Sequence, residues 1–526
     1  MSGRILRALA SLACVAPFVL PACVVNLNDR NSPLENGGVS GPPANCAQIT
    51  PLGEGGPSSD PKAVKTKLLG RYDLTDPTRP HFDWSGNSMN ARFRGTQVTW
   101  GADSPIELVF EQIVDGVATQ QILGGLEKKS VTIDVPAGEH EITVVRSSEA
   151  LFSDGIFVPF TFGPGTEQLA PIERPRRIEY IGDSITCGYG DEGANATCPY
   201  DVPIRPELDP NGKPITNAAG EIQYVKIPES QNIYLAYGSI AARRLAADAV
   251  TLCFSGKGMV LNYREQGVGE GKILNPNDDA DPDAKTTIPD YYLRTIATVG
   301  PNVTCKLTEP SKAPNGRGPS KDCPSNDCDQ GLCRCTKSAD CCAAGDADCA
   351  KAEGRCVAPP ANTPGAGGNV CKNPDYQAWD FAKETVQPQI VFINIGTNDF
   401  SRDANQDSIS DGVDLASFRA GYKRFVDFVR SKRPDAQIFL SVPPMLTDKF
   451  PFDNARSDFR NTIRSIVDQV NAAGDAKVYF FELIEMGVRY GLGCDYHPNL
   501  EVHRIMADQV VGAIVSKTCW STVSTP

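Results

Sequence analysis

The chain has 526 residues, of which 40% are apolar, 22% charged and 8% aromatic, and its formal net charge is −13. This composition is typical of a globular protein, and the length exceeds what one hydrophobic core usually organises, so we expect more than one domain. The acidic balance argues against nucleic acid and anionic membrane surfaces as partners, since both carry negative charge. The net charge does not exclude a neutral substrate such as a polysaccharide.

The N-terminal segment predicts export. Arg4 and Arg7 precede an apolar run at residues 8–22 that is too short to span a bilayer. The stretch "LPAC" is similar to a bacterial lipobox and makes Cys23 the candidate lipidation site, although Pro21 is unusual there. We therefore expect a signal peptide at 1–22 and a lipoprotein of the bacterial cell envelope, with simple secretion as the alternative. Removal of Cys14 with the signal and lipidation of Cys23 leave 16 of the 18 cysteines, an even number, and in an oxidising compartment these are expected to form disulfides.

Two different patterns follow the signal. Residues 23–60 are rich in Gly, Pro, Ser and Asn and lack hydrophobic periodicity, which predicts a flexible tether. Residues 61–170 contain short alternating runs such as "ARFRGTQVTW", which predict a β-sandwich of the jelly-roll type. Within it, "VTIDV" and "EITVV" flank "PAGEH", and Pro136 and Gly138 predict a hairpin turn.

From residue 171 to 526, continuous apolar strands alternate with amphipathic helices. The helices are indicated by apolar residues at helical spacing near 418–429 and 459–470. Apolar strands without alternation are typical of a parallel sheet covered on both faces. We therefore predict a three-layer α/β/α domain. The expected strands are "RIEYI", "AVTLCF", "QIVFINI", "QIFLSV" and "KVYFFEL".

A cysteine-rich segment interrupts this domain at about residues 305–371. It contains ten cysteines among Gly, Pro, Asp and Lys and has almost no aliphatic residues for a core. Five local disulfides are the interpretation we favour for an exported protein, and a metal site is the alternative. The sequence does not indicate what this insertion does.

Polar residues follow the expected strands where catalytic groups of a parallel sheet gather. Ser184 comes just after "RIEYIG", Gly256 follows "AVTLCF", and Asn398 lies in "GTND" after the third strand. His497 is in a late loop before the last helix, whereas His503 lies within that helix and is expected to be structural. A nucleophile, a base and oxyanion donors that converge are what acyl transfer requires. A serine that merely caps a helix is the alternative for Ser184.

These blocks resemble those of the SGNH (GDSL) hydrolase superfamily, and the body as a whole resembles carbohydrate esterase family 2. The matching stretches include "GRYDLTDPTRPHFDWSGNSMNARFRGT", "RRIEYIGDSITCGYG", "SGKGMVLNYR", "INIGTNDF" and "CDYHPN". The resemblance implies a jelly roll followed by an SGNH domain, and an esterase that removes O-acetyl groups from polysaccharides such as xylan or mannan. It implies Ser184 as nucleophile, His497 as base, and Ser184, Gly256 and Asn398 as oxyanion donors. It implies no metal and no organic cofactor.

One position departs from the superfamily pattern. Cys494 stands three residues before His497, where an aspartate is usual, and Asp495 stands two before it. The resemblance to carbohydrate esterase family 2 implies a Ser-His dyad oriented by a backbone carbonyl, which we favour, with the Asp495 carboxylate as the alternative orienter. Cys494 is expected in a disulfide. Tyr496 is a candidate for stacking on a sugar, or else packs in its loop, and Tyr189 is a candidate cleft residue.

Asp183 and Asp399 flank the candidate catalytic residues and are expected to be structural hydrogen-bonding groups. A further acidic segment, "DANQDSISDGVD" at residues 403–414, partly fits a calcium loop, but it lacks the turn glycine and the final glutamate. A solvated acidic loop is the favoured interpretation.

Three alternatives to a carbohydrate acetylesterase stay open. They are an esterase on other small or lipid acyl esters, a deacetylase of peptidoglycan or exopolysaccharide, and a non-catalytic glycan-binding lipoprotein. If His497 is a base with an ordinary imidazole pKa, activity should fall below about pH 6.5.

Overall fold

A computed structural model of the chain describes most of its residues. The described residues are 38–50, 52–60, 65–126, 128–209, 211–217, 219–263, 286–302, 317–318, 320–321, 323–329, 332–342, 355–358, 368–402, 410–487 and 490–523. The expected signal peptide, the lipidation site at Cys23 and residues 403–409 of the acidic segment lie outside them. Among the helices in the described ranges, none has both the length and the apolarity that a membrane span needs.

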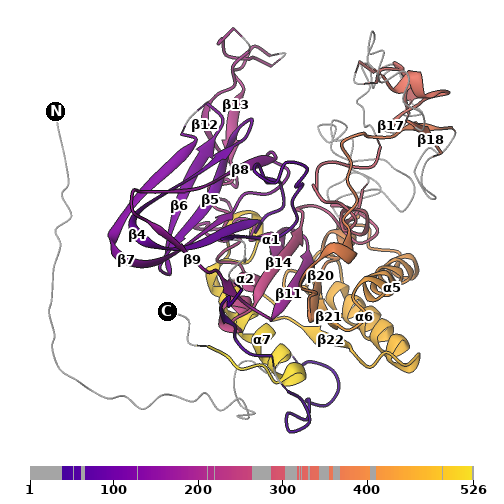
Figure 1. The fold of residues 1–526 in the computed structure, drawn as a ribbon. Coiled ribbons are helices and arrows are strands. Elements are labelled where there is room, and N and C mark those ends of the chain that lie inside the picture. Colours follow the sequence, from indigo (N-terminus) through magenta and orange to yellow (C-terminus); the bar gives the residue numbers. More distant parts are fainter. Residues whose placement is uncertain are drawn as a thin grey trace, which may run out of the picture.

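A parallel sheet forms the centre of the C-terminal domain (Figure 1). In the described part of the chain it has five strands in the order β14-β11-β20-β21-β22, and all neighbouring pairs run parallel. Because β11 lies between β14 and β20, the connections leave it in opposite directions, as in doubly wound sheets. The predicted α/β/α fold is confirmed. The strands are β11 (Arg177–Gly182), β14 (Asp248–Cys253), β20 (Ile390–Asn394), β21 (Gln437–Val442) and β22 (Val478–Glu482).

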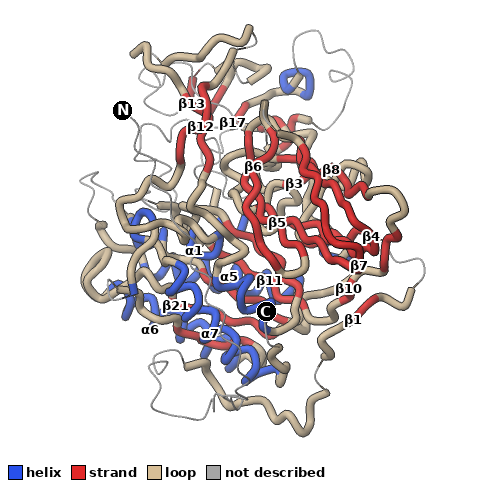
Figure 2. Tube along the Cα trace, turned by 90° about the vertical axis from the view of Figure 1, so that its left-hand side faces the viewer, coloured by secondary structure: helices blue, strands red, loops and turns tan. Residues whose placement is uncertain are grey.

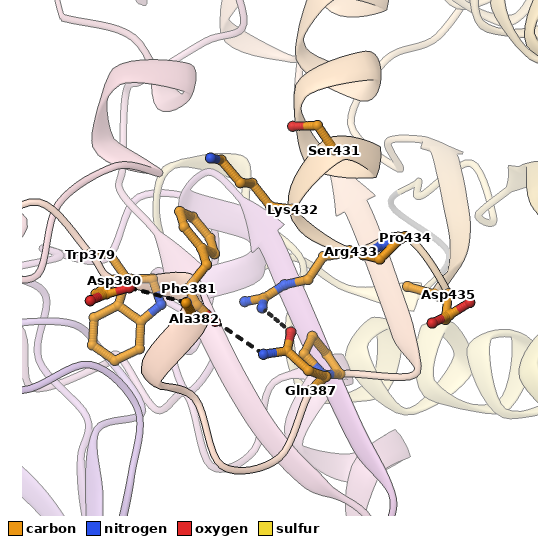
Figure 3. Close-up of a pocket in the computed structure, with 12 residues that line it drawn as sticks. Trp379, Asp380, Phe381, Ala382, Gln387, Ser431, Lys432, Arg433, Pro434 and Asp435 are labelled. Carbon is orange, nitrogen blue, oxygen red and sulfur yellow. Dashed lines mark hydrogen bonds between the residues drawn. The ribbon is translucent and has the colours of Figure 1, made fainter.

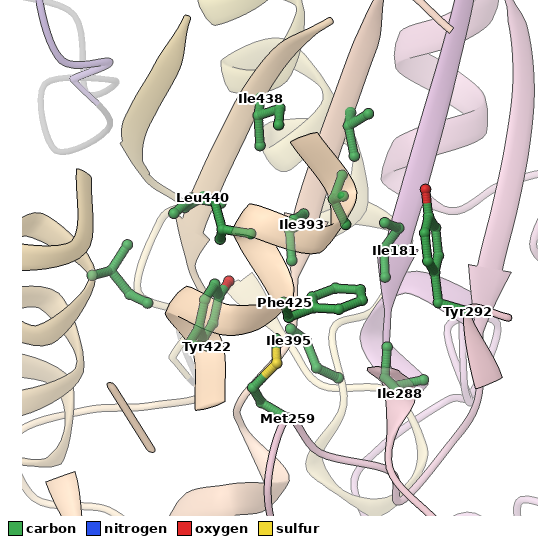
Figure 4. Packing of buried hydrophobic residues seen from close by; sticks show 14 of the residues in the cluster. Ile181, Met259, Ile288, Tyr292, Ile393, Ile395, Tyr422, Phe425, Ile438 and Leu440 are labelled. Atoms are coloured by element: carbon green, nitrogen blue, oxygen red, sulfur yellow. The ribbon is translucent and has the colours of Figure 1, made fainter. Parts of the chain in front are cut away.

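Helices cover both faces of this sheet, because neighbouring strand residues point to opposite sides. Ile393 packs with α5 and α6, whereas Phe392 packs with α2 and α7 on the other face. Figure 4 shows the first of these two clusters, where Tyr422 and Phe425 of α5 approach strand residues such as Leu440. The helices are α1 (Ser184–Cys187), α2 (Tyr237–Arg244), α3 (Ile288–Tyr291), α5 (Leu415–Lys432), α6 (Ala455–Ala472) and α7 (Leu500–Thr518), with 3₁₀ turns η4 (Phe381–Lys383), η5 (Asn398–Ser401) and η7 (Cys494–Tyr496).

The N-terminal domain is an antiparallel β-domain around its own core, which includes Trp100 and Phe110. Its long strand β4 changes partners along one edge, since it pairs with β2 and β9 near its start and with β8 near its end, whereas β7 pairs with β4 along nearly its whole length. The predicted β-rich N-terminal domain is confirmed. The strands are β2 (Thr66–Leu69), β3 (His81–Phe82), β4 (Ser88–Asp103), β5 (Glu107–Val114), β6 (Val117–Gly124), β7 (Ser130–Arg146), β8 (Gly155–Phe162) and β9 (Glu167–Leu169).

The hairpin predicted around Pro136 and Gly138 is wrong. Residues 130–146 form the single strand β7, which pairs with β4 on both sides of these residues. The register shifts between Gly95 and Gln97, so the segment with Pro136 bulges out of the ladder instead of reversing the chain. A bulge suits proline, because it has no N–H to donate to the neighbouring strand.

The two domains are joined by buried contacts. Trp84 of the β-domain packs into the core of the α/β domain, and its indole N–H donates to the carbonyl oxygen of Thr295. The carboxylate of Asp83 accepts the backbone N–H groups of Ala297 and Thr298, each at 2.8 Å. Separating the domains would break these buried hydrogen bonds and expose the Trp84 ring to water, so the contacts favour the joined arrangement.

The predicted tether at 23–60 is wrong for its described part, residues 38–50 and 52–60. Cys46 forms a disulfide with Cys519, and the amine of Lys517 donates to the carbonyl of Gly41. Strand β1 (Gly56–Pro57) pairs with β10 (Ile172–Glu173). Gly- and Pro-rich chain lacks a core of its own, but here backbone hydrogen bonds and a disulfide hold it along the α/β domain. Residues 23–37 lie outside the described part.

Two further elements are inserted in the sequence of the α/β domain, and Figures 1 and 2 show the first of them beside the β-domain, where Arg205 pairs with Glu107. One is a ribbon of β12 (Val202–Pro206) and β13 (Tyr224–Ile227). The other is the cysteine-rich insertion, with the short strands β15 (Arg317–Gly318), β16 (Cys328–Asp329), β17 (Leu332–Cys333), β18 (Cys356–Val357) and β19 (Val370–Cys371) and the 3₁₀ turn η3 (Ser338–Cys341).

Disulfides are present in the described part of the insertion. They join Cys323 to Cys333, Cys335 to Cys356 and Cys341 to Cys371, and Cys328 and Cys342 are also disulfide-bonded. The sulfur atoms of Cys335, Cys341 and Cys371 lie within 4.8 Å of one another, as in a metal site. Each is committed to a disulfide and is not a free thiolate, so the structure opposes the metal alternative for this cluster.

Candidate active site

Ser184 lies at the carboxyl end of β11, the strand between β14 and β20. It is the first residue of the one-turn helix α1, whose N-cap is Asp183, because the Asp183 carboxylate accepts the N–H of Ile185. The structure therefore contradicts the alternative in which Ser184 is only a capping residue. A disulfide between Cys187 and Cys253 ties α1 to the end of β14.

The hydroxyl of Ser184 contacts the imidazole of His497. Their Oγ and Nε2 atoms are 2.8 Å apart, and Nδ1 of the same ring is 3.0 Å from the main-chain oxygen of Asp495. A carbonyl oxygen only accepts, so Nδ1 must carry the hydrogen of the neutral ring. Nε2 then presents its lone pair to the Ser184 hydroxyl, which is the tautomer a general base needs.

The Asp495 carboxylate does not orient the imidazole in this structure, and this corrects the candidate role of that side chain. It accepts instead from the hydroxyl of Tyr189, at 2.7 Å. Asp495 and Tyr496 have φ angles of 50° and 62°, both in the left-handed region. This backbone conformation turns the Asp495 carbonyl, rather than its side chain, toward His497.

Several contacts hold this strained turn, which costs on the order of 1–3 kcal/mol per left-handed residue. Cys494 forms a disulfide with Cys198, as expected, and its N–H donates to the carbonyl of Gly190 at 3.0 Å. The N–H of Asp495 donates to the carbonyl of Ala196 at 3.1 Å. The segment at 190–198 therefore fixes the turn that carries His497.

An aromatic stack supports His497 from the side. The ring of Tyr189 stacks on His497 with centroids 4.3 Å apart and on Tyr200 with centroids 3.6 Å apart. Tyr189 is thus engaged with protein rings and supports the imidazole, and its predicted place in the substrate cleft stays a prediction. Tyr496 is 63% exposed next to His497. Its proposed contact with a sugar stays a prediction.

The other candidate oxyanion residues follow the strands on each side of β11. Gly256 adopts a φ of 76° after β14, a conformation that favours glycine. Asn398 follows β20, is 7% exposed and uses one of its amide hydrogens to donate to the carbonyl of Lys257 at 2.9 Å. This contact joins the Gly256 and Asn398 segments directly.

Asp399 reinforces the same connection, as expected for a structural group. Its carboxylate accepts the N–H groups of Met259, Val260 and Leu261 at 2.7–2.9 Å. Burial raises the pKa of Asp399 to about 7, although the N–H donors act in the opposite direction. Burial also raises the pKa of Asp183 to about 7.

Burial has the opposite effect on a base. It lowers the pKa of His497 to about 4, because the imidazolium is poorly solvated there, and the contact with the Asp495 carbonyl opposes the shift only in part. His497 is therefore neutral at physiological pH. His503 is buried in α7, and its Nδ1 accepts the N–H of Tyr237 at 3.1 Å, so its expected structural role is confirmed.

A pocket of about 470 Å³ lies away from this site, at the opposite end of the parallel strands (Figure 3). Pro388 and Ala436 of its lining precede β20 and β21, whereas Asn398 follows β20. Within it, Gln387 bridges the carbonyl of Phe381 and the guanidinium of Arg433. These contacts tie η4 to the end of α5, and none of them involves Ser184 or His497.

Sequence reasoning missed Cys198 and Tyr200, which contact the residues around His497, and Glu149, whose carboxylate contacts Ser255 and Tyr200. Cys198 could have been considered from the sequence, because Cys494 was expected to form a disulfide and therefore needed a cysteine partner. Tyr200 and Glu149 carried no signal, because their contacts depend on how distant segments pack.

Comparison with known proteins adds the family. A model described as carbohydrate esterase 2 N-terminal matches residues 68–171, which is the β-domain. The GDSL-like lipase/acylhydrolase family model matches residues 355–505, a range that contains Asn398 and His497. The relatives of this chain are family 2 carbohydrate esterases.

Two curated relatives illustrate the family 2 carbohydrate esterases. The cellulase/esterase CelE of Acetivibrio thermocellus is 26% identical over 462 residues, covering 86% of this chain and 39% of that protein. An acetylxylan esterase/glucomannan deacetylase of Cellvibrio japonicus is 24% identical, covering 39% of this chain and 49% of that protein. The chain therefore spans less than half the length of these two relatives.

Solved structures of family 2 esterases share the fold. A family two carbohydrate esterase from Clostridium thermocellum, in complex with cellohexaose, has a TM-score of 0.55 at 25% identity, over 86% of this chain and 99% of that one. The acetyl xylan esterase Est2A from Butyrivibrio proteoclasticus also has a TM-score of 0.55, at 18% identity, over 88% of this chain and 96% of that one.

Proposed function

We propose that this protein is a serine esterase that removes O-acetyl groups from polysaccharides such as xylan or mannan. The observation that carries the proposal is the contact of Ser184 Oγ with His497 Nε2, on a ring whose Nδ1 is held by the Asp495 carbonyl. This pair supplies a nucleophile and a base in the correct tautomer without a third carboxylate.

The reaction follows from this geometry. His497 takes the hydroxyl proton as Ser184 attacks the acetyl carbonyl, and the imidazolium then gives that proton to the departing sugar oxygen. Water, deprotonated by His497, hydrolyses the acetyl-serine to acetate and restores the enzyme. The N–H groups of Ser184 and Gly256 and the amide of Asn398 are the proposed donors to the oxyanion.

The carbohydrate part of the proposal is supported by the relatives, which include an acetylxylan esterase/glucomannan deacetylase, and by the esterase solved with cellohexaose. On this chain, the exposed ring of Tyr496 beside His497 is the proposed platform for a sugar. The exported location and the lipid anchor at Cys23 also remain proposals. The disulfides throughout the described residues support an oxidising compartment.

The test is acetate release from acetylated xylan and acetylated glucomannan, measured for the full chain and for Ser184→Ala. The variant should lose activity by about four orders of magnitude or more, as for other serine nucleophiles. The matched control is Ser431→Ala, because that hydroxyl lies on α5 and donates to the carbonyl of Phe428. It should retain full activity.

The remaining alternatives give different results in the same assay. Preference for long-chain or lipid esters over acetylated sugars would favour a general esterase. Acetate release from acetylated peptidoglycan alone would identify a cell-envelope polymer as the substrate. Retention of both polymers by the wild type and Ser184→Ala, without acetate release by either, would favour a glycan-binding protein and overturn the catalytic proposal.

A further inference from the structure

Glu149 belongs to the β-domain, but its carboxylate is directed into the α/β domain. It follows strand β7 by three residues, and the residue is fully buried. Its Oε2 accepts the N–H of Ser255 at 2.7 Å, and its Oε1 accepts the hydroxyl of the same serine. Oε1 also receives the side-chain amide of Gln231, at 3.2 Å, and lies 3.3 Å from the hydroxyl of Tyr200. All of these donors belong to the α/β domain.

The first set of contacts leads to the oxyanion segment. Ser255 immediately precedes Gly256, whose N–H is a proposed oxyanion donor. Two hydrogen bonds from one residue to one carboxylate fix both its backbone and its side chain, so they limit the motion of the next peptide group. Because the carboxylate is buried and accepts charge-assisted hydrogen bonds, these contacts are stronger than neutral ones.

The second set leads to the base. The Tyr200 hydroxyl reaches Glu149 directly and also through Gln231, whose amide oxygen it approaches to 2.7 Å. The Tyr200 ring stacks on Tyr189, and Tyr189 stacks on His497. Tyr189 also donates to Asp495, the residue whose carbonyl holds Nδ1 of the imidazole. One carboxylate is thus connected to both the oxyanion segment and the support of His497.

We propose that Glu149 is a positioning residue through which the β-domain sets the geometry of the active site. It holds the Ser255–Gly256 segment and the Tyr200–Tyr189–His497 stack in a fixed relation to each other. The β-domain is then an integral part of the esterase and not a separate binding module. This inference rests on the proposed function, because positioning matters only if Ser184 and His497 react.

Asp83 provides a matched comparison within the same interface. It is also a fully buried carboxylate of the β-domain that accepts backbone N–H groups of the α/β domain, those of Ala297 and Thr298. The groups that hydrogen-bond to it belong neither to the oxyanion segment nor to the aromatic stack. If Glu149 only stabilised the interface between the domains, replacing Asp83 would have the same consequences for catalysis as replacing Glu149.

The experiment compares Glu149→Gln with Asp83→Asn in the full chain, using 4-nitrophenyl acetate. Both changes remove a buried carboxylate with little change of shape, so both should lower the melting temperature. Only Glu149→Gln should lower kcat, by about 10- to 100-fold, because small displacements of catalytic groups have effects of that size. KM should stay within about twofold, since the site for the substrate is not itself removed. Asp83→Asn should keep its kcat.

Two milder variants test the two sets of contacts one at a time. They also replace Glu149→Gln in the experiment if that variant does not fold. Ser255→Ala removes the hydroxyl donor beside the oxyanion segment, and Tyr200→Phe removes the hydroxyl donor of the stack. Each should lower kcat without changing KM, and only Tyr200→Phe should shift the pH dependence, because its stack surrounds His497.

The outcomes distinguish this inference from the proposed function. If the wild type is active and Ser184→Ala is not, but Glu149→Gln keeps the wild-type kcat, the positioning role is wrong and the esterase proposal stands. Equal losses of kcat in Glu149→Gln and Asp83→Asn would also overturn the positioning role. Both carboxylates would then act only by stabilising the interface between the domains. A wild-type protein without esterase activity would overturn both.

Discussion

Nδ1 of His497 is held by the main-chain carbonyl of Asp495, two residues earlier in the chain. The left-handed conformation of Asp495 makes this contact geometrically accessible, and the carboxylate of the same residue faces Tyr189 instead. The backbone thereby takes the orienting function that a third acidic side chain has in a triad. This relationship determines how the site should respond to substitution.

Asp495→Asn is therefore expected to retain activity within about fivefold of the wild type. Asparagine tolerates the left-handed backbone, so the orienting carbonyl should keep its place. Loss of a true triad aspartate to asparagine costs about 10⁴-fold in kcat. The measurement is kcat on 4-nitrophenyl acetate beside His497→Ala, which should be almost inactive. A loss near 10⁴-fold in Asp495→Asn would assign the orienting role to the carboxylate after all.

The pH dependence should reflect the buried imidazole. His497 acts as a base only when neutral, and burial lowers its pKa to about 4. The acid side of the kcat/KM profile should therefore fall near pH 4, and not near the pH of about 6.5 expected for an unperturbed histidine. Initial rates between pH 3.5 and 8, with buffer hydrolysis subtracted, test this. A midpoint close to 6.5 would mean that His497 is solvated during turnover.

The disulfide between Cys198 and Cys494 should matter for catalysis as well as for stability. The double variant Cys198→Ser/Cys494→Ser frees the turn that places the Asp495 carbonyl, so we expect kcat to fall by about tenfold or more. The matched control is Cys46→Ser/Cys519→Ser, which opens a disulfide of even larger sequence separation, 473 residues against 296. It should lower the melting temperature but leave kcat unchanged. A similar kcat in both double variants would exclude a special role for Cys198–Cys494.

Glu111 should make the stability of the domain interface depend on pH. It is 5% exposed, and burial together with the charge of Glu192 raises its pKa to about 7. Asn232 donates to both carboxylates, at 3.2 and 3.1 Å. Because the folded state binds the Glu111 proton more tightly than the unfolded state, its contribution to stability is present at low pH. That contribution is lost as the pH rises from about 4.5 through 7.

Glu111→Gln removes this dependence, since the amide stays neutral. The variant should melt several degrees above the wild type at pH 8 and close to it at pH 5, as measured by calorimetry at both pH values. Glu107→Gln serves as the control, because Glu107 is also buried on β5 but pairs with Arg205. It should be destabilised at both pH values. The prediction would be contradicted if the melting temperatures of the wild type and Glu111→Gln differed by the same amount at pH 5 and at pH 8.

Much of the fold could be predicted because its signals are local. Buried parallel strands such as Ile390–Asn394 are apolar except at their last residue, and α5 has apolar residues at helical spacing, so both patterns can be recognised without knowledge of the partners. The errors occurred where local composition conflicts with distant contacts. Residues 23–60 were predicted to form a tether, but within their described part Cys46 is bonded to Cys519, 473 residues further along the chain. Pro136 was predicted to lie in a hairpin turn, but it belongs to β7, and β4 pairs with β7 on both sides of this residue.

The sequence by itself determined the chemical groups of the site. Ser184, Gly256 and Asn398 each follow a strand, and three neighbouring parallel strands bring their ends together whatever the loops do. Only the tertiary structure decided how His497 is oriented and what surrounds it. The choice between the Asp495 carbonyl and its carboxylate depends on two backbone torsions, and the positions of Tyr200 and Glu149 depend on the packing of two domains. Such contacts join residues far apart in the chain, so no local pattern encodes them.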